Sequence, residues 1–133
     1  MQVARAYFSN AAPRHTADEE ESLFPRLRAS SDPDARRAVE IVERLERDHA
    51  RADLCHAEID ALVSRWLDDG NLSDELRTDL RAHLAQLRSI YEPHIACEDL
   101  ELFPAAARVL TFEEVAAIGR EMAARRKAPA QRW

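Results

Sequence analysis

Two segments of the chain repeat one arrangement of possible metal ligands. Each has a histidine with a glutamate four residues later, His15 with Glu19 and His94 with Glu98, and each ends in Leu-Phe-Pro. A spacing of four places the imidazole and the carboxylate on one helix face, one turn apart, which suits joint ligation of a cation. A neutral imidazole suits iron, and a carboxylate can bridge two cations and offset their charge.

A third histidine, His49, falls at the matching depth if the chain folds as helices joined by short turns. At about 1.5 Å of rise per residue, His15, His49 and His94 lie at nearly one height. Glu19 and Glu98 fall together about one turn below them. A lone His-x-x-x-Glu would arise by chance, whereas two copies with a third histidine at their level predict a metal site.

The same arithmetic separates the other two histidines from this site. His56 is about 10 Å along the helix axis from His49, so it is only a further candidate ligand. His83 is about 16 Å from His94. We expect both to be core histidines that form hydrogen bonds with side chains or backbone. Asp53, one turn after His49, is a candidate to support the ligands by hydrogen bonding.

Helices must position these residues, because the chain has only two glycines and is rich in Ala, Leu, Arg and Glu. Asp32 is a suitable N-cap with Pro33 at the first helical position, and Asp69–Asn71 contains a helix-ending glycine. Ser73 caps the next helix, and Thr111–Glu114 reads as a capping box. The expected helices cover about 3–27, 33–68, 73–109 and 111–126.

Apolar residues three and four apart form a stripe along each long helix, and the histidines are set into these stripes. In the second helix the stripe contains Val42, Leu45, His49, Ala52, His56, Ile59, Val63 and Trp66. In the third it contains Leu76, Leu80, His83, Leu87, Ile90, His94 and Cys97, and in the first Phe8, Ala12, His15 and Glu19. All five histidines are therefore expected to face the core, where a polar side chain needs partners.

The 133 residues are expected to form one helical domain, 1–126, with a flexible C-terminal tail, 127–133. Pro13 should kink the first helix and Pro25 should lie in its last turn. Pro93 and Pro104 should bend the third helix without ending it.

Composition excludes two kinds of partner. A net charge of -6 argues against nucleic acid, because phosphate binding needs a basic face. No apolar run approaches the roughly 20 residues of a membrane span, and the N-terminus lacks a signal segment, so a cytoplasmic location is expected. Cys55 and Cys97 should be free thiols there. Cys97 is either a core residue or a redox-active thiol beside the metal.

The motifs resemble those of the hemerythrin-like (HHE cation-binding) domain family. The family pattern has His-x-x-x-Glu-Glu-x-x-Leu-Phe-Pro on one helix, Glu/Asp-His on the next, and His-x-x-x-Glu with a second Leu-Phe-Pro on a later one. Here these correspond to His15–Pro25, Asp48-His49 and His94–Pro104. The resemblance covers nearly the whole chain and implies an all-α, antiparallel four-helix bundle.

The resemblance also implies a carboxylate-bridged di-iron centre that binds dioxygen or related small ligands, such as nitric oxide or peroxide. By this likeness the three histidines are terminal ligands and the two glutamates are bridges: His15, His49, His94, Glu19 and Glu98. A ferritin-like di-iron site is a weaker alternative, because it needs two Glu-x-x-His motifs and this chain has one, Glu46–His49.

One departure from the family pattern concerns the usual first helix, which supplies a further histidine. The chain begins at the position of the second bundle helix, so the expected fold lacks that first helix and has a short extra C-terminal helix. Three explanations stay open: a shortened N-terminus, a homodimer that lends a helix, or a site with fewer metals. Three long amphipathic helices would leave an apolar groove, which the Thr111–Arg126 helix could partly cover.

Three functions follow as hypotheses. The first is a non-catalytic iron protein that binds or senses a small ligand, favoured by the apolar residues Leu45, Leu87 and Ile90 near the predicted site. The second is an oxidative or nitrosative stress enzyme that acts on peroxide or nitric oxide at the same centre. The third is a metal-free helical module that binds another protein.

Overall fold

The computed structural model describes residues 11–128, which form four continuous helical stretches and contain no strand. The all-α prediction is therefore confirmed for this part of the chain. The first stretch comprises α2 (Ala12–Ala17), a π-helical segment η2 (Asp18–Leu23) and α3 (Phe24–Ala29). The others are α4 (Ala35–Asp69); α5 (Asp74–Cys97), η3 (Glu98–Leu102) and α6 (Phe103–Val109); and α7 (Phe112–Lys127). The expected helix start near Val3, the stripe residue Phe8 and the tail after 128 lie outside the described residues.

Local sequence signals set most of the helix ends. Gly70 follows α4 with φ of 70°, the left-handed conformation that glycine adopts readily at a helix end. The hydroxyl of Ser73 accepts a hydrogen bond from the amide of Leu76 and so caps α5. Thr111 and Glu114 form the predicted capping box at the start of α7. These three boundaries agree with the expectation because each depends only on neighbouring residues.

The start of α4 differs from the prediction by two residues. The chain leaves α3 after Ala29, and Pro33 lies in a turn before the helix instead of at its first position. Oδ1 of Asp32 accepts the amide N–H of Asp34 at 2.8 Å, and its backbone carbonyl accepts the N–H of Ala35 at 3.0 Å. Asp32 therefore closes a turn first, and the helix begins after it.

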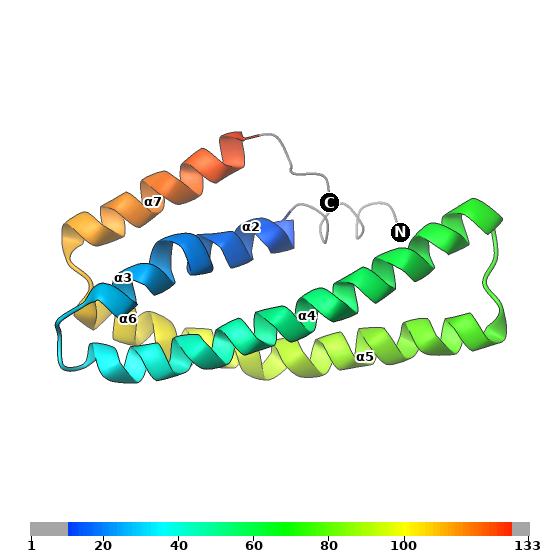
Figure 1. The fold of residues 1–133 in the computed structure, drawn as a ribbon, viewed down its shortest axis with the longest axis horizontal. Coiled ribbons are helices and arrows are strands. Elements are labelled where there is room, and N and C mark those ends of the chain that lie inside the picture. Colours follow the sequence, from blue (N-terminus) through cyan, green and yellow to red (C-terminus); the bar gives the residue numbers. More distant parts are fainter. Residues whose placement is uncertain (1–10, 129–133) are drawn as a thin grey trace. The chain divides into compact units, whose positions relative to one another are not determined.

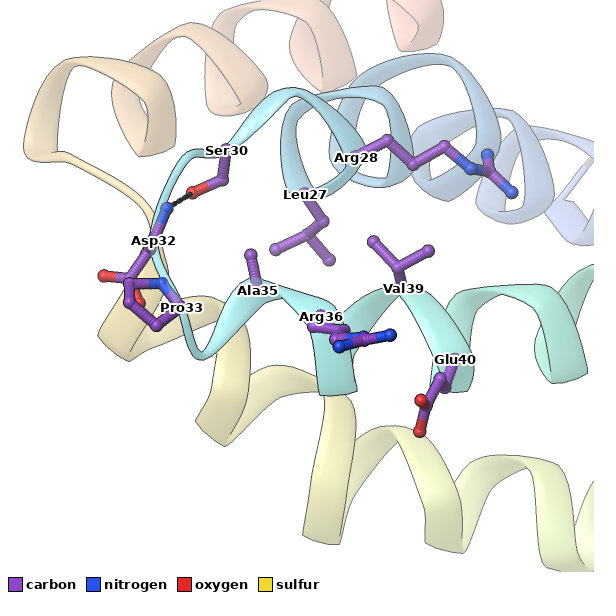
Figure 2. Close-up of a pocket in the computed structure, with 9 residues that line it drawn as sticks. All are labelled: Leu27, Arg28, Ser30, Asp32, Pro33, Ala35, Arg36, Val39 and Glu40. Carbon is purple, nitrogen blue, oxygen red and sulfur yellow. Dashed lines mark hydrogen bonds between the residues drawn. The ribbon is translucent and has the colours of Figure 1, made fainter.

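A surface hollow of about 620 Å³ lies at this turn between α3 and α4. Figure 2 shows the side chains of Leu27, Ala35 and Val39 pointing toward one another inside it, with Ser30 and Asp32 hydrogen-bonded at its edge. None of the predicted metal ligands lines this hollow.

The backbone divides into two compact units. The first unit consists of residues up to Arg44 together with those from Cys97 onward, and the second unit is Leu45–Ala96. In the second unit, the C-terminal part of α4 and most of α5 form a helical hairpin, connected by the loop 70–73 (Figure 1). Its buried residues include Leu45, Ala52, Ile59, Leu80, Leu87 and Ile90, as the predicted stripes require.

In the first unit, α7 packs on η2 through charged groups. The carboxylate of Asp18, 1% exposed, accepts hydrogen bonds from Arg125 at 3.0 Å and Arg126 at 2.7 Å. Arg26 donates two hydrogen bonds to Glu121, at 3.0 and 2.7 Å. α7 has no fully buried residue, and these ion pairs connect it to η2 and α3.

Candidate metal centre

The first unit brings together three of the predicted ligands: His15 of α2, Glu19 of η2 and Glu98 of η3. Nε2 of His15 lies 3.5 Å from Oε1 of Glu19 and 3.9 Å from Oε2 of Glu98. The two carboxylates, one from each repeated segment, therefore approach the same nitrogen. Both are buried, with 3% and 4% exposure.

His15 itself does not match the expectation that it faces the core. Its side chain is 55% exposed, whereas Glu19, one turn later, is buried. Helical spacing predicts correctly that the two lie on one face, since their side chains are in contact. It does not predict how much of that face is covered, because coverage depends on neighbouring elements.

The second unit brings together the other two predicted ligands, His49 of α4 and His94 of α5. Their imidazole rings are 4.8 Å apart between centroids and tilted by 50°. Both side chains are buried, with 4% and 3% exposure. The expectation that these histidines meet at one level is confirmed. Two adjacent buried imidazoles are a donor pair that suits a transition metal.

Asp48, which the sequence marks only as the residue before His49, contacts His94 of this pair. Oδ2 of Asp48 lies 3.5 Å from Nδ1 of His94, while its Oδ1 accepts a hydrogen bond from Arg51 at 3.3 Å. Asp53, the carboxylate that we expected in a supporting role, is exposed. The only sequence signal for Asp48 was its position directly before His49.

His56 has a partner outside the ligand set, as expected for a core histidine. Its Nε2 is 2.9 Å from the hydroxyl of Tyr91, and burial lowers the pKa of the imidazole, against a smaller opposite effect of Asp53. The ring of Tyr91 in turn stands edge-on to His94, with centroids 6.0 Å apart. His83 is partly buried.

Both cysteines are buried free thiols. Sγ of Cys97, the residue before Glu98, accepts a hydrogen bond from Arg44 at 2.7 Å. The same guanidinium lies 3.3 Å from Glu101, and its pKa is raised, first by the contact with Cys97. Cys97 is thus a core residue with a cationic neighbour.

Four of the five predicted ligands are buried side chains that each offer an atom able to hold a metal ion: Glu19, His49, His94 and Glu98. Imidazole and carboxylate donors both suit iron, and the carboxylates offer charge to offset the cation. Residues 2–106 match the hemerythrin HHE cation-binding domain. The chain belongs to this family. The matched segment contains every predicted ligand and ends in α6, before α7.

Comparison with individual proteins adds little about the activity of this HHE domain. An uncharacterised protein of Haemophilus influenzae is 34% identical over 124 residues. The alignment covers 92% of this chain and 65% of that relative, so the chain spans less than two thirds of the relative's length. No solved structure matches the chain. Among the helices of residues 11–128, none combines the length and the apolar character that a membrane span requires.

Proposed function

We propose that this HHE domain is a non-heme iron protein with a carboxylate-bridged di-iron centre. The observation that carries the proposal is the burial, within each unit, of side chains that suit a metal: the adjacent imidazoles of His49 and His94, and the carboxylates of Glu19 and Glu98. Placing charged carboxylates in a protein interior is costly unless a cation or a hydrogen-bond network compensates them. The family description, cation binding, agrees with a bound metal as that compensation.

The proposed ligands are the five residues predicted from the sequence: His15, Glu19, His49, His94 and Glu98. The approach of both glutamates to the same nitrogen of His15 supports their assignment as bridges, because a bridging carboxylate must reach a point that its partner also reaches. His56 stays outside the proposed set, since its Nε2 contacts the hydroxyl of Tyr91.

We further propose that the centre binds dioxygen or a related small ligand. Iron supplies electrons to such a ligand when it is bound. Leu45, Leu87 and Ile90 lie on the helices that carry His49 and His94, and they are 0%, 4% and 2% exposed. An apolar surround made by such side chains would hold little water and offer no acid or base to complete a reaction, which favours reversible binding over turnover.

The test of this function has two steps. The metal-free protein is titrated anaerobically with ferrous iron, and the loaded protein is then exposed to oxygen. We expect iron to bind, and a visible absorption band to appear with oxygen and to reverse when oxygen is removed. His49→Ala should remove the band, and His83→Ala should keep it. The proposal fails if the wild-type protein binds no iron, or binds it equally well without His49.

The amount of iron per chain should be measured together with the oligomeric state. Two irons per chain in a homodimer would mean that a second copy contributes a ligand. If the iron-loaded protein consumed peroxide or nitric oxide continuously and showed no reversible spectral change, the protein would be an enzyme and not a reversible ligand-binding protein.

A further inference from the structure

Both glutamates of the proposed centre lie at the start of a widened helical turn. Glu19 is the second residue of η2, and Glu98 is the first residue of η3. The carbonyl of Glu19 accepts the N–H of Phe24, and the carbonyl of Glu98 accepts the N–H of Phe103. Each of these bonds spans five residues instead of the four of an α-helix.

A proline directly follows the donor of each five-residue bond: Pro25 after Phe24, and Pro104 after Phe103. Proline has no N–H, and its ring clashes with the carbonyl four residues earlier. The ordinary α-helical hydrogen bond is therefore blocked at the same place in both repeats. The helix accommodates the block by admitting one additional residue into the preceding turn, and α-helix resumes with the proline in its first turn.

Proline alone does not widen a turn, as Pro93 shows. It lies inside α5, and no π-helical segment precedes it. In both repeats the residue two positions before the proline is a buried leucine: Leu23 is 9% exposed and Leu102 is 0% exposed. Leu-Phe-Pro therefore places a buried leucine, which can anchor the turn, directly before the hydrogen-bond donor Phe and the blocked position at Pro.

We propose that Pro25 and Pro104 are positioning residues for the metal centre, because each maintains the widened turn that carries a ligand glutamate. This inference rests on the proposed function. One residue corresponds to about 100° of rotation around an α-helix. Closing the turn to α-helical spacing would therefore rotate Glu19 relative to the buried anchor at Leu23, and Glu98 relative to Leu102. The two carboxylates could then no longer approach one point.

The test compares Pro25→Ala, Pro104→Ala and the double variant with the wild-type protein. Alanine restores an N–H that can bond to the carbonyl four residues earlier, and it favours a helix. We expect helical content and cooperative unfolding to be retained. The dissociation constant for ferrous iron, measured by anaerobic titration, should rise about tenfold or more for each single variant. Hydrogen exchange at the amides of Phe24 and Phe103 should change as the bond register changes.

Two controls separate positioning from stability. Pro33→Ala replaces an exposed proline in the turn before α4 and should leave iron binding unchanged. Leu80→Ala opens a cavity in the second unit, at a position outside both repeated segments, and should lower the unfolding temperature without the tenfold loss of affinity. If Leu80→Ala weakens iron binding as much as the proline variants do, the prolines act only through stability.

The inference is overturned if Pro25→Ala and Pro104→Ala bind iron as tightly as the wild-type protein. Failure of the proposed function gives a different result, because the wild-type protein would then bind no iron at all. If a proline variant does not fold, the other repeat still provides the test.

Discussion

Oδ2 of Asp48 lies 3.5 Å from Nδ1 of His94, so a carboxylate contacts one ring nitrogen of this buried imidazole. A carboxylate at Nδ1 favours the tautomer that carries its proton there, which leaves Nε2 as the nitrogen for a metal. Arg51 donates a hydrogen bond to the other oxygen of Asp48 and restrains the carboxylate. Asp48 therefore connects the proposed ligand to the surface of α4.

Asp48→Asn should weaken iron binding about 10- to 100-fold, because the amide keeps the size of the side chain but loses the charge that orients His94. Anaerobic titration with ferrous iron measures the change. Asp53→Asn, an exposed position on the same helix, is the matched control and should leave the affinity unchanged. Equal losses in the two variants would mean that only net charge matters.

His94→Ala should abolish iron loading, whereas His83→Ala should leave it nearly intact. His94 is 3% exposed and adjacent to His49, while His83 is only partly buried and lies three turns earlier on α5. Metal analysis of protein purified from iron-supplemented cells provides the measurement. Iron retained by His94→Ala at the wild-type level would contradict the ligand assignment.

The ion pair between Glu121 and Arg26 should make stability depend on pH in the acid range. Hydrogen bonds from Arg26 and Ser22 lower the pKa of Glu121 from 4.5 to about 2. Between pH 4.5 and pH 2 the unfolded chain binds more protons than the folded one. The contribution of this ion pair to the free energy of unfolding is therefore complete above pH 4.5 and is lost as the pH falls toward 2. In urea unfolding, the stability gap between wild type and Glu121→Gln should be largest near neutral pH and vanish near pH 2.

Glu40→Gln, an exposed position on α4, is the control for that measurement. Its stability difference from the wild-type protein should not follow the same pH curve. If the difference in the free energy of unfolding between wild type and Glu121→Gln stayed constant down to pH 2, Arg26 would not be lowering the pKa of Glu121.

Features that depend on neighbouring residues were predictable from the sequence. The buried stripe through Val42, Leu45 and His49 follows from helical periodicity, and the caps at Ser73 and Thr111 follow from hydroxyl side chains before helical segments. The meeting of His49 with His94 followed from counting residues on either side of one turn.

Features that depend on distant residues were not predictable. Asp18 and Arg125 are 107 positions apart, and an Arg- and Glu-rich chain offers many pairs of equal plausibility. The exposure of His15 is set by what covers its helix, not by its own stripe. The widened turns were missed for another reason: Pro104 was expected to bend its helix, but sequence does not tell a bend from an additional residue in the turn.

The contact between α7 and η2 yields the last prediction. Asp18 is 1% exposed and receives its hydrogen bonds from Arg125 and Arg126, and the bond to Asp18 is the main reason that the pKa of Arg126 is raised. Replacing both arginines by alanine should destabilise the protein by about 1–3 kcal/mol in urea unfolding, because a buried carboxylate loses its partners. Arg120→Ala, exposed on α7, should change stability by no more than about 0.5 kcal/mol.

With Asp18→Asn already present, removing Arg125 and Arg126 should lower the free energy of unfolding by less, since the charge that they compensate is gone. Additive losses would instead mean that the arginines stabilise α7 independently of Asp18.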